Sequence, residues 1–559
     1  MKKKWWQEAV VYEIYCKSFC DSDGDGIGDL KGVMSKLDML KDLGVNCLWF
    51  TPIYTSPQVD NGYDVADYQN IDPAYGTMED FKELLDRAHS MGIRVIMDQV
   101  LNHSSDEHYW FQESRKSKDN PYRDYYIWQP PKADGTPPNN WGNYFHDGNG
   151  SAWEFDPLTG EYYFHQYAVK MPDLNWECPA LREEIYRMLR WWLDLGVDGF
   201  RLDVFTRFKK PAGFPDSKLT PSRLDMNGFI VDKDACTNVE GIHEILHDLY
   251  TNVFGPKDCF TVGEGAGVTY ENALSYISQS REEVNAAYHF QMAGRGAPIL
   301  TAEGFRRLQK GWAKVLDHNA IPVQYLSNHD NGRQVSRHGN DGEYRLESAK
   351  ALGILLHTTP GIPFVYQGEE IGMTNVKYDS IDQYRCCYTV GNYPNLIALG
   401  KTPAEALEEL APTSRDNART PYQWNDTPNA GFTSGTPWIG TNPNYKEINL
   451  EKDRQNPQGI FRHYQALIQL RKEHPAILDG DLTFLLEDHP SVIAYLRRCA
   501  RETILVLVNL SSKEETVTLP ESVTSHLWSC VLSGRGDQPE ISAKHRLLPW
   551  ASEVYTMEN

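Results

Sequence analysis

Three acidic side chains each end a stretch that is typical of a buried β-strand. Residues 199–205, GFRLDVF, alternate as a strand does, so Arg201 and Asp203 emerge on the same face of a sheet. A cation beside a carboxylate keeps that carboxylate ionised, as a nucleophile requires. Glu264 ends the segment VGE, and Asp330 ends LSNHD. These strand ends predict one pocket for nucleophilic and acid–base chemistry.

The second of these acids has the features of a proton donor. Glu264 lies between Gly263 and Gly265, and an unpaired glutamate in an apolar site has a raised pKa, which a general acid needs. A lone acid at a strand end is more often a helix N-cap than a catalyst. Arg201 beside Asp203, with Glu264 on the next strand, favours catalysis because buried charges are costly unless they are paired or used.

Two histidines follow the same pattern of strand ends. His103 ends DQVLNH, which begins at Asp98, and His329 precedes Asp330. Isolated histidines are usually satisfied core residues, but these positions favour contact with a polar substrate. A catalytic zinc site is disfavoured because the chain has no HxH or HExxH pair, and no GxSxG elbow indicates a serine hydrolase.

The run DSDGDGIGD at 21–29 resembles the first part of an EF-hand calcium loop. It departs from that loop at Gly32, where a bidentate glutamate would be expected. A solvated turn is the alternative, and we expect a structural Ca²⁺ or Mg²⁺ site. The predicted ligands are Asp21, Asp23, Asp25, the carbonyl of Ile27, and Asp29.

The elements that would position these residues alternate between helix and strand. Segments 39–52, 84–100 and 188–204 each give a helical stretch, a glycine suited to a helix C-cap, and an apolar strand. Five more strands are expected at 10–19, 259–265, 285–292, 323–329 and 361–370. Eight strands with covering helices predict a (β/α)₈ barrel, whose chemistry gathers at the C-terminal strand ends. An open doubly wound sheet is the weaker alternative, because no GxGxxG turn or P-loop occurs.

Two long interruptions and a change of pattern suggest further domains. An aromatic, Asn- and Gly-rich insertion follows the third strand, another long excursion covers 371–455, and alternating strands with polar turns form the C-terminal end. The predicted division is a first barrel part at 1–103, an inserted domain at 104–172, a second barrel part at 173–480 and an antiparallel β domain at 481–559.

Composition limits the class of protein. The 559 residues carry a net charge of −22, which disfavours nucleic acid and anionic membranes as partners. There is no apolar run long enough for a membrane span, no signal-peptide pattern and no CxxC pair among ten cysteines. We expect a cytoplasmic protein with reduced thiols, a monomer or small homo-oligomer, that uses no organic cofactor.

Taken together, the motifs resemble those of the α-amylase family of glycoside hydrolases, family 13. DQVLNH (98–103), GFRLDV (199–204), VGEG (262–265) and LSNHD (326–330) are similar to its four conserved segments, and MPDLN (171–175) to a fifth. The resemblance implies a barrel with an inserted domain after strand three and a C-terminal β domain. It also implies roles for seven residues: Asp203 as nucleophile, Glu264 as general acid/base, Asp330 as transition-state stabiliser, His103, Arg201 and His329 around the cleaved glucose, and Asp98 in support.

Within the family, the chain resembles the oligo-1,6-glucosidase and dextran glucosidase group. SPQVDNGYDV and RDNARTPYQW are that group's pattern for an exo-acting pocket. They would supply Asp60 to bind the terminal glucose, Tyr63 to stack on its ring, and Arg419 to pair with Asp60. Val204 is the residue type associated there with α-1,6 bonds.

The activity implied is that of a retaining exo-α-glucosidase acting on isomalto-oligosaccharides or related short α-glucosides. Alternatives within the family are α-1,4-glucosidase, trehalose-6-phosphate hydrolase and sucrose isomerase. A non-catalytic partner of a membrane transporter is a further alternative, disfavoured because the catalytic acids are kept.

Overall fold

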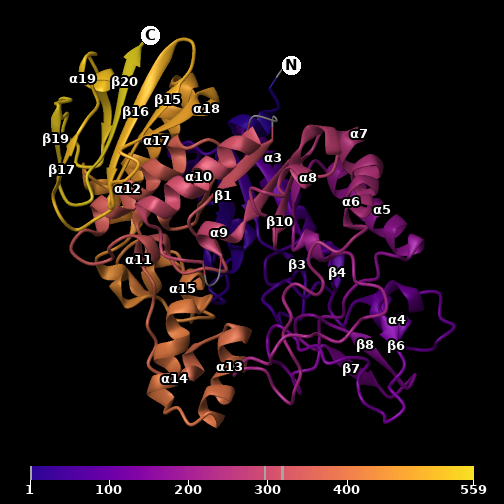
Figure 1. Cartoon of the computed structure of the whole chain (residues 1–559). Helices are drawn as coiled ribbons and strands as arrows, with labels where there is room; N and C mark the ends of the chain where they lie inside the picture. Colours follow the sequence, from indigo (N-terminus) through magenta and orange to yellow (C-terminus); the bar gives the residue numbers. More distant parts are fainter. Residues whose placement is uncertain (1–2, 295–296, 317–319) are drawn as a thin grey trace.

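The computed structural model describes residues 3–294, 297–316 and 320–559 (Figure 1). Its centre is a closed barrel of eight parallel strands, each hydrogen-bonded to its neighbours in chain order, which confirms the predicted (β/α)₈ architecture. The strands are β1 (Val11–Ile14), β2 (Cys47–Phe50), β5 (Arg94–Gln99), β9 (Gly199–Leu202), β10 (Phe260–Gly265), β11 (Ala286–His289), β12 (Ile321–Gln324) and β13 (Ile362–Tyr366).

Helices cover the outside of the barrel. The longer ones are α2 (Leu37–Leu43), α3 (Met78–Ser90), α5 (Pro179–Leu195), α6 (Ile242–Leu249), α10 (Ala302–Leu316), α12 (Arg345–Thr358) and α17 (Ile460–Glu473). Gly44 and Gly196 end α2 and α5 with φ of 99° and 115°, a left-handed conformation that glycine adopts without steric cost. The residues that α5 buries, from Leu181 to Trp192, form a stripe at helical spacing.

Short helices lie between the longer elements along the chain. The helices are α1 (Leu30–Met34), α4 (Tyr109–Ser114), α7 (Gly255–Lys257), α8 (Leu274–Ile277), α9 (Phe290–Ala293), α11 (Gln334–His338), α16 (Leu450–Gln455), α18 (Pro475–Asp479) and α19 (Glu521–Thr524). After β2, a two-stranded sheet of β3 (Tyr54–Thr55) and β4 (Asp67–Ile71) encloses the loop that carries Asp60 and Tyr63.

An inserted sheet lies between β5 and β9, where the sequence predicted an insertion. It consists of β6 (Trp128–Gln129), β7 (Trp153–Asp156) and β8 (Glu161–Phe164), all antiparallel. The loop after β9 also packs on this region, since the Gly142 amide donates a 2.7 Å hydrogen bond to the Ile230 carbonyl. The loop that follows Asp203 therefore adds to the wall that the insertion forms.

The excursion at 371–455 contains a helical pair, α13 (Cys387–Ala398) and α14 (Pro403–Leu410), followed by α15 (Asp416–Arg419). In Figure 1 this pair projects from the barrel on the same side as the inserted sheet. Segments far apart in the chain thus surround one end of the barrel.

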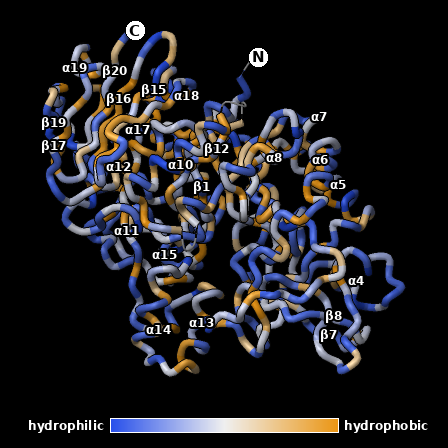
Figure 2. The backbone as a smooth tube through the Cα atoms, viewed as in Figure 1, coloured by the Kyte–Doolittle hydropathy of each residue, from blue (hydrophilic) through white to orange (hydrophobic). Residues whose placement is uncertain are grey.

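The C-terminal region is antiparallel, as predicted. One sheet has the order β14 (Asp481–Leu485), β15 (Val492–Arg498), β16 (Glu502–Asn509), β20 (Ser552–Glu558) and β18 (Ser529–Ser533), and a second pairs β17 (Glu515–Thr518) with β19 (Lys544–Leu547). Figure 2 shows hydrophobic residues along β16 and α12, two elements that pack together. The limits proposed for the individual domains stay predictions.

Among the described residues, no helix has both the length and the apolar character needed to cross a bilayer.

Candidate active site

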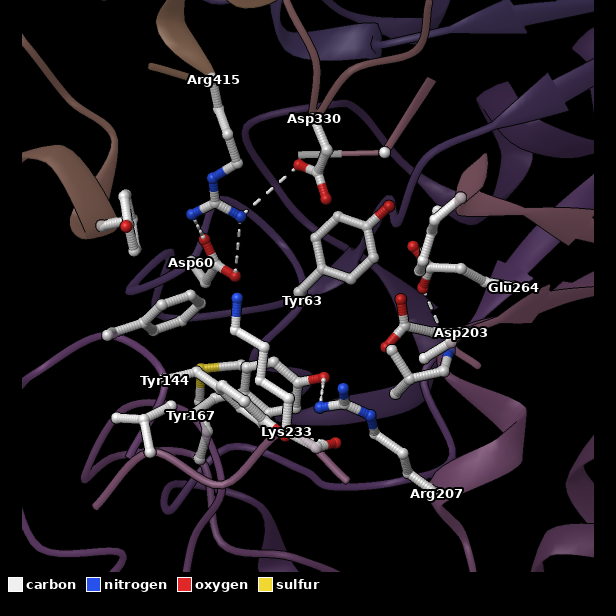
Figure 3. Close-up of a pocket in the computed structure, with 18 of the residues that line it drawn as sticks. Asp60, Tyr63, Tyr144, Tyr167, Asp203, Arg207, Lys233, Glu264, Asp330 and Arg415 are labelled. Atoms are coloured by element: carbon white, nitrogen blue, oxygen red, sulfur yellow. Dashed lines mark hydrogen bonds and ion pairs between the residues drawn. The ribbon is translucent and has the colours of Figure 1, made fainter. Parts of the chain in front are cut away.

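A cavity of about 480 Å³ opens at the C-terminal ends of the barrel strands (Figure 3). Six of the residues predicted for the site line it: Asp60, Tyr63, His103, Asp203, Glu264 and Asp330. The other four, Asp98, Arg201, His329 and Arg419, bond directly to these lining residues. The ten residues come from six separate segments of the chain, and the fold brings all of them together.

Arg201 is the centre of the carboxylate cluster. The parallel register sets Arg201 on β9 beside Asp98 on β5. Its Nη1 donates to Asp98 at 2.8 Å and to Asp203 at 2.6 Å, and its Nη2 lies 2.8 Å from Glu264. One buried guanidinium therefore holds three buried carboxylates, and Asp203 and Glu264 share it as a common partner.

The environment of Glu264 differs from the one that the sequence suggested. The carboxylate is paired with Arg201, and it also accepts a 3.1 Å hydrogen bond from the Val204 amide. Burial nevertheless outweighs these contacts and raises the pKa of Glu264 to about 7. Gly263 gives the side chain no extra space, because a Cβ there would lie 2.5 Å from the Phe205 ring.

Asp203 has the lower pKa of the two proposed catalytic acids. Burial raises its pKa to about 6, with Arg201 opposing that rise. We expected Arg201 to hold Asp203 fully ionised, but Arg201 also serves Asp98, whose pKa burial likewise raises to about 6. The pKa of Asp203 is still below that of Glu264, as catalysis requires. Between about 6 and about 7, an ionised Asp203 and a protonated Glu264 coexist.

A buried chain of polar groups supports the other side of the site. His329 Nδ1 lies 2.5 Å from Glu13, and its Nε2 lies 2.7 Å from the Tyr63 hydroxyl, which donates to Asp98 at 2.9 Å. Burial lowers the pKa of His329 to about 3, so its imidazole is neutral. Sequence reasoning missed Glu13, although an acid inside the apolar run VVYEIY was a usable signal.

His103 offers an unused hydrogen-bonding atom at the cavity. Its Nδ1 lies 3.2 Å from the Asn102 amide, whereas its buried Nε2 has no partner among the described residues. Burial lowers the pKa of His103 to about 4, so the ring is neutral near pH 7. A sugar hydroxyl could satisfy this nitrogen.

The predicted pairing of Asp60 with Arg419 is wrong. Arg415 Nη2 lies 2.5 Å from Asp60, and Arg419 donates to Asp330 at 2.7 Å. Arg415 and Arg419 stand four residues apart at the ends of α15, so both project to the same side and the sequence pattern did not separate them. The Cys387 thiol also contacts Asp60, at 3.3 Å.

The predicted metal loop brings some of its acids together. Ligand atoms of Asp21, Asp23 and Asp29 lie within 4.8 Å of one another, and Asp25 is outside this group. Burial raises the pKa of Asp25, and the neighbouring acids add to that rise. Oxygen donors of this kind fit a hard cation such as Ca²⁺ or Mg²⁺. No other group of at least three such ligands occurs in the described part of the chain.

The chain with this cluster of carboxylates at the barrel mouth matches two known family models. The family model "Alpha amylase, catalytic domain" matches residues 13–480, and "Maltogenic Amylase, C-terminal domain" matches residues 482–541. The chain belongs to the α-amylase family. It is accordingly a glycoside hydrolase.

Full-length relatives differ in the substrates that their names state. The chain is 46% identical to an oligo-1,6-glucosidase of Parageobacillus thermoglucosidasius over 99% of each chain. It is 40% identical to a trehalose-6-phosphate hydrolase of Bacillus subtilis (strain 168), over 99% of this chain and 98% of the relative.

Similar solved structures also carry more than one named activity. A trehalose-6-phosphate hydrolase of Bacillus licheniformis has a TM-score of 0.91 at 42% identity, and a trehalulose synthase of Pseudomonas mesoacidophila MX-45 has a TM-score of 0.91 at 40% identity. Each match covers the whole of both chains.

Proposed function

We propose that this protein is a retaining, exo-acting α-glucosidase that cleaves α-1,6-glucosidic bonds at the non-reducing end of isomalto-oligosaccharides or related short α-glucosides. The observation that carries the proposal is the attachment of Asp203 and Glu264 to one guanidinium, that of Arg201, at the wall of the cavity. Four oligo-1,6-glucosidases at 43–46% identity support the choice of substrate.

The two carboxylates divide the reaction into two steps. In retaining glycosidases they lie about 5–5.5 Å apart, so that one attacks while the other protonates the leaving oxygen. Asp203 attacks the anomeric carbon as Glu264 donates its proton to the glycosidic oxygen, which gives a glycosyl-enzyme and a free aglycone. Glu264 then takes a proton from water, the water attacks the anomeric carbon, and glucose leaves with its α configuration retained.

The opposite end of the cavity supports exo action. Asp60 and Arg415 form a buried ion pair there, and Asp60 is placed to accept hydrogen bonds from the hydroxyls of a terminal glucose. Asp330, held by Arg419, is partly exposed to the cavity and can bond the sugar more strongly as positive charge develops at the ring. We expect this ion pair to block a further sugar residue at that end of the cavity.

The α-1,6 preference is the finer part of the proposal. Val204 follows the nucleophile, lines the cavity, and is the residue type that the resemblance associates with this linkage. Assays of isomaltose, maltose, sucrose and trehalose 6-phosphate in parallel, with product anomers followed by NMR, test it. Fastest release of α-glucose from isomaltose is expected, and an initial excess of β-glucose beyond that contributed by the reducing-end unit would overturn the retaining mechanism.

Trehalose-6-phosphate hydrolase is the second candidate function. The 40% identity to the enzyme of that name and the structural match over the full chain favour it. The same assay separates the two, because that activity requires turnover of trehalose 6-phosphate well above that of isomaltose.

We also propose a structural Ca²⁺ or Mg²⁺ ion held by Asp21, Asp23, Asp25, the carbonyl of Ile27, and Asp29. The proximity of three of these carboxylates supports it. EDTA is expected to lower the melting temperature and added Ca²⁺ to restore it, whereas Asp23→Ala should abolish this response. An unchanged melting temperature in EDTA would refute the site.

The proposed location is the cytoplasm. All ten cysteines are free thiols, a state that persists in reducing compartments. Cell fractionation tests the location, and sedimentation tests the predicted monomer or small homo-oligomer.

A further inference from the structure

Four buried side chains form a continuous series of polar contacts that runs from Glu13 through His329 and Tyr63 to Asp98. Glu13 lies on β1 and is 1% exposed. Its Oε1 lies 2.5 Å from His329 Nδ1 and accepts a 3.2 Å hydrogen bond from the His329 amide. His329 Nε2 lies 2.7 Å from the Tyr63 hydroxyl, and that hydroxyl lies 2.9 Å from Asp98. Three side-chain contacts of hydrogen-bond length therefore join four groups.

The number of protons in this series follows from the number of contacts. Each contact needs a proton between its two atoms, because lone pairs that face one another at 2.5–2.9 Å repel. A neutral histidine ring carries one N–H proton, and a tyrosine carries one hydroxyl proton. These two protons serve two of the three contacts. The series therefore holds one further proton, which resides on Glu13, on the ring of His329 or on Asp98.

Asp98 is the acid of the series that a cation stabilises in its ionised form. Arg201 Nη1 donates to both of its oxygens, at 2.8 and 3.1 Å. Burial raises the pKa of Asp98 to about 6, so the group is mostly ionised at pH 7. Asp98 therefore accepts the hydroxyl proton of Tyr63, and His329 Nε2 donates to the Tyr63 oxygen.

The ring of His329 does not hold the further proton. Burial lowers its pKa to about 3, and the guanidinium groups of Arg419, Arg201 and Arg415 oppose another positive charge. A neutral ring with its proton on Nε2 has an acceptor at Nδ1. That nitrogen needs a donor, and the atom 2.5 Å away from it belongs to Glu13.

Glu13 has the surroundings of a neutral carboxylic acid. Its one ion-pair contact among the described residues is with His329. Burial raises the pKa of Glu13 well above its ordinary value, and the charge of Arg201 opposes this rise, whereas the charges of Asp330 and Asp98 add to it. The remaining titratable groups that act on Glu13 are three buried tyrosines, which are neutral near pH 7: Tyr288, Tyr325 and Tyr366.

We propose that Glu13 is a positioning residue that keeps its carboxyl proton near pH 7 and donates it to His329 Nδ1. This hydrogen bond holds His329 in its Nε2–H tautomer, and the Nε2–H group in turn directs the Tyr63 hydroxyl to Asp98. The role in catalysis rests on the α-glucosidase function proposed above, in which Tyr63 and His329 contact the cleaved glucose. An ionised Glu13 would require the Nδ1–H tautomer and a protonated Asp98, which would weaken the attachment of Asp98 to Arg201.

The position of the proton can be measured without turnover. Neutron diffraction from crystals exchanged into D₂O at neutral pD is expected to show deuterium bonded to Glu13 Oε1 and to His329 Nε2. In solution, infrared spectra of the wild type and Glu13→Gln should differ by one carbonyl band of a protonated carboxylic acid, present only in the wild type. Deuterium bonded to Nδ1, or the same carboxylic acid bands in both proteins, would overturn the proposal.

Variants measure the effect of Glu13 on catalysis. Glu13→Met has a side chain of similar length without a donor, and kcat on isomaltose is expected to fall about 10–100-fold. Glu13→Gln can donate from its amide and should restore most of this loss. Unchanged kcat in Glu13→Met, or equal losses in Glu13→Met and Glu13→Gln, would overturn the positioning role.

Glu370→Met is the matched control. Glu370 is also a buried glutamate, but its side chain accepts hydrogen bonds from the hydroxyls of Tyr12 and Tyr422. Its replacement is expected to lower the melting temperature without lowering kcat. The comparison separates the loss of a buried acid from the loss of the donor to His329.

The two proposals fail in distinguishable ways. A wild type that cleaves isomaltose but has an ionised Glu13 keeps the α-glucosidase function and removes only the role of Glu13. A wild type that cleaves none of the α-glucosides contradicts the α-glucosidase function, and the diffraction and infrared results still decide where the proton resides.

Discussion

Replacing Glu264 with glutamine should remove activity and yet stabilise the protein above neutral pH. Burial raises the pKa of Glu264 from its ordinary 4.5 to about 7. Each pH unit of such a rise corresponds to about 1.4 kcal/mol, so the ionised side chain costs the folded state about 3 kcal/mol at pH 8. Glutamine avoids this cost and can still accept hydrogen bonds from Arg201 and from the Val204 amide.

The direction in which stability changes with pH follows from the direction of the pKa change. A carboxyl group whose folded pKa is raised costs little below its unfolded pKa, and the fold loses stability as pH rises from 4.5 to about 7. The advantage of Glu264→Gln should therefore be about 1 kcal/mol at pH 5 and reach about 3 kcal/mol at pH 8.

Thermal and urea unfolding of the wild type and the variant at pH 5 and pH 8 measure this difference, alongside kcat. General acid–base catalysis contributes about 10²–10⁴-fold, and a loss of kcat in that range is expected. Glu447→Gln is a suitable control because its side chain is 84% exposed. A variant that is less stable than the wild type at pH 8, or an advantage that does not change with pH, would refute the reasoning.

Three further predictions concern the same cavity. Asp203→Asn should lower kcat by about 10⁴-fold or more with an unchanged circular dichroism spectrum, and near-normal turnover would contradict its role as nucleophile. The pH profile of kcat/KM should be a bell with a maximum at about 6.5, because Asp203 must be ionised and Glu264 protonated; a profile that stays flat to pH 9 would exclude this assignment. Arg415→Lys should raise KM for isomaltose about tenfold by loosening Asp60, and a change in kcat alone would place Arg415 elsewhere in the mechanism.

The barrel could be predicted because the sequence pattern of each helix–strand unit is local. Each helix, glycine and apolar strand occupies one continuous stretch, so periodicity identified the unit, and positive φ at Gly44 and Gly196 matches the cap that the pattern required. The loop after β9 was not anticipated as part of the inserted wall. Its contact between Gly142 and Ile230 joins segments about ninety residues apart, and no local pattern encodes that pairing.

The site could be predicted as a set of residues more readily than as a set of contacts. Arg415 and Arg419 occupy equivalent positions one helical turn apart, so only the direction of approach of Asp60 decides which of them it meets. Glu13 was overlooked because its partner, His329, lies 316 residues away in the sequence. Such pairings depend on how the barrel closes, which sequence spacing does not specify.

The charge balance around Arg201 explains how the site keeps a proton available. Three buried carboxylates share one guanidinium, so full ionisation of Asp98, Asp203 and Glu264 would leave two negative charges uncompensated in a poorly hydrated space. The cluster therefore favours retention of a proton near pH 7, and Glu264 has the highest pKa of the three. Arg207, four residues beyond Asp203, could have neutralised part of this excess, but none of the three carboxylates is its hydrogen-bond partner. A second cation placed outside the cluster leaves the proton on Glu264.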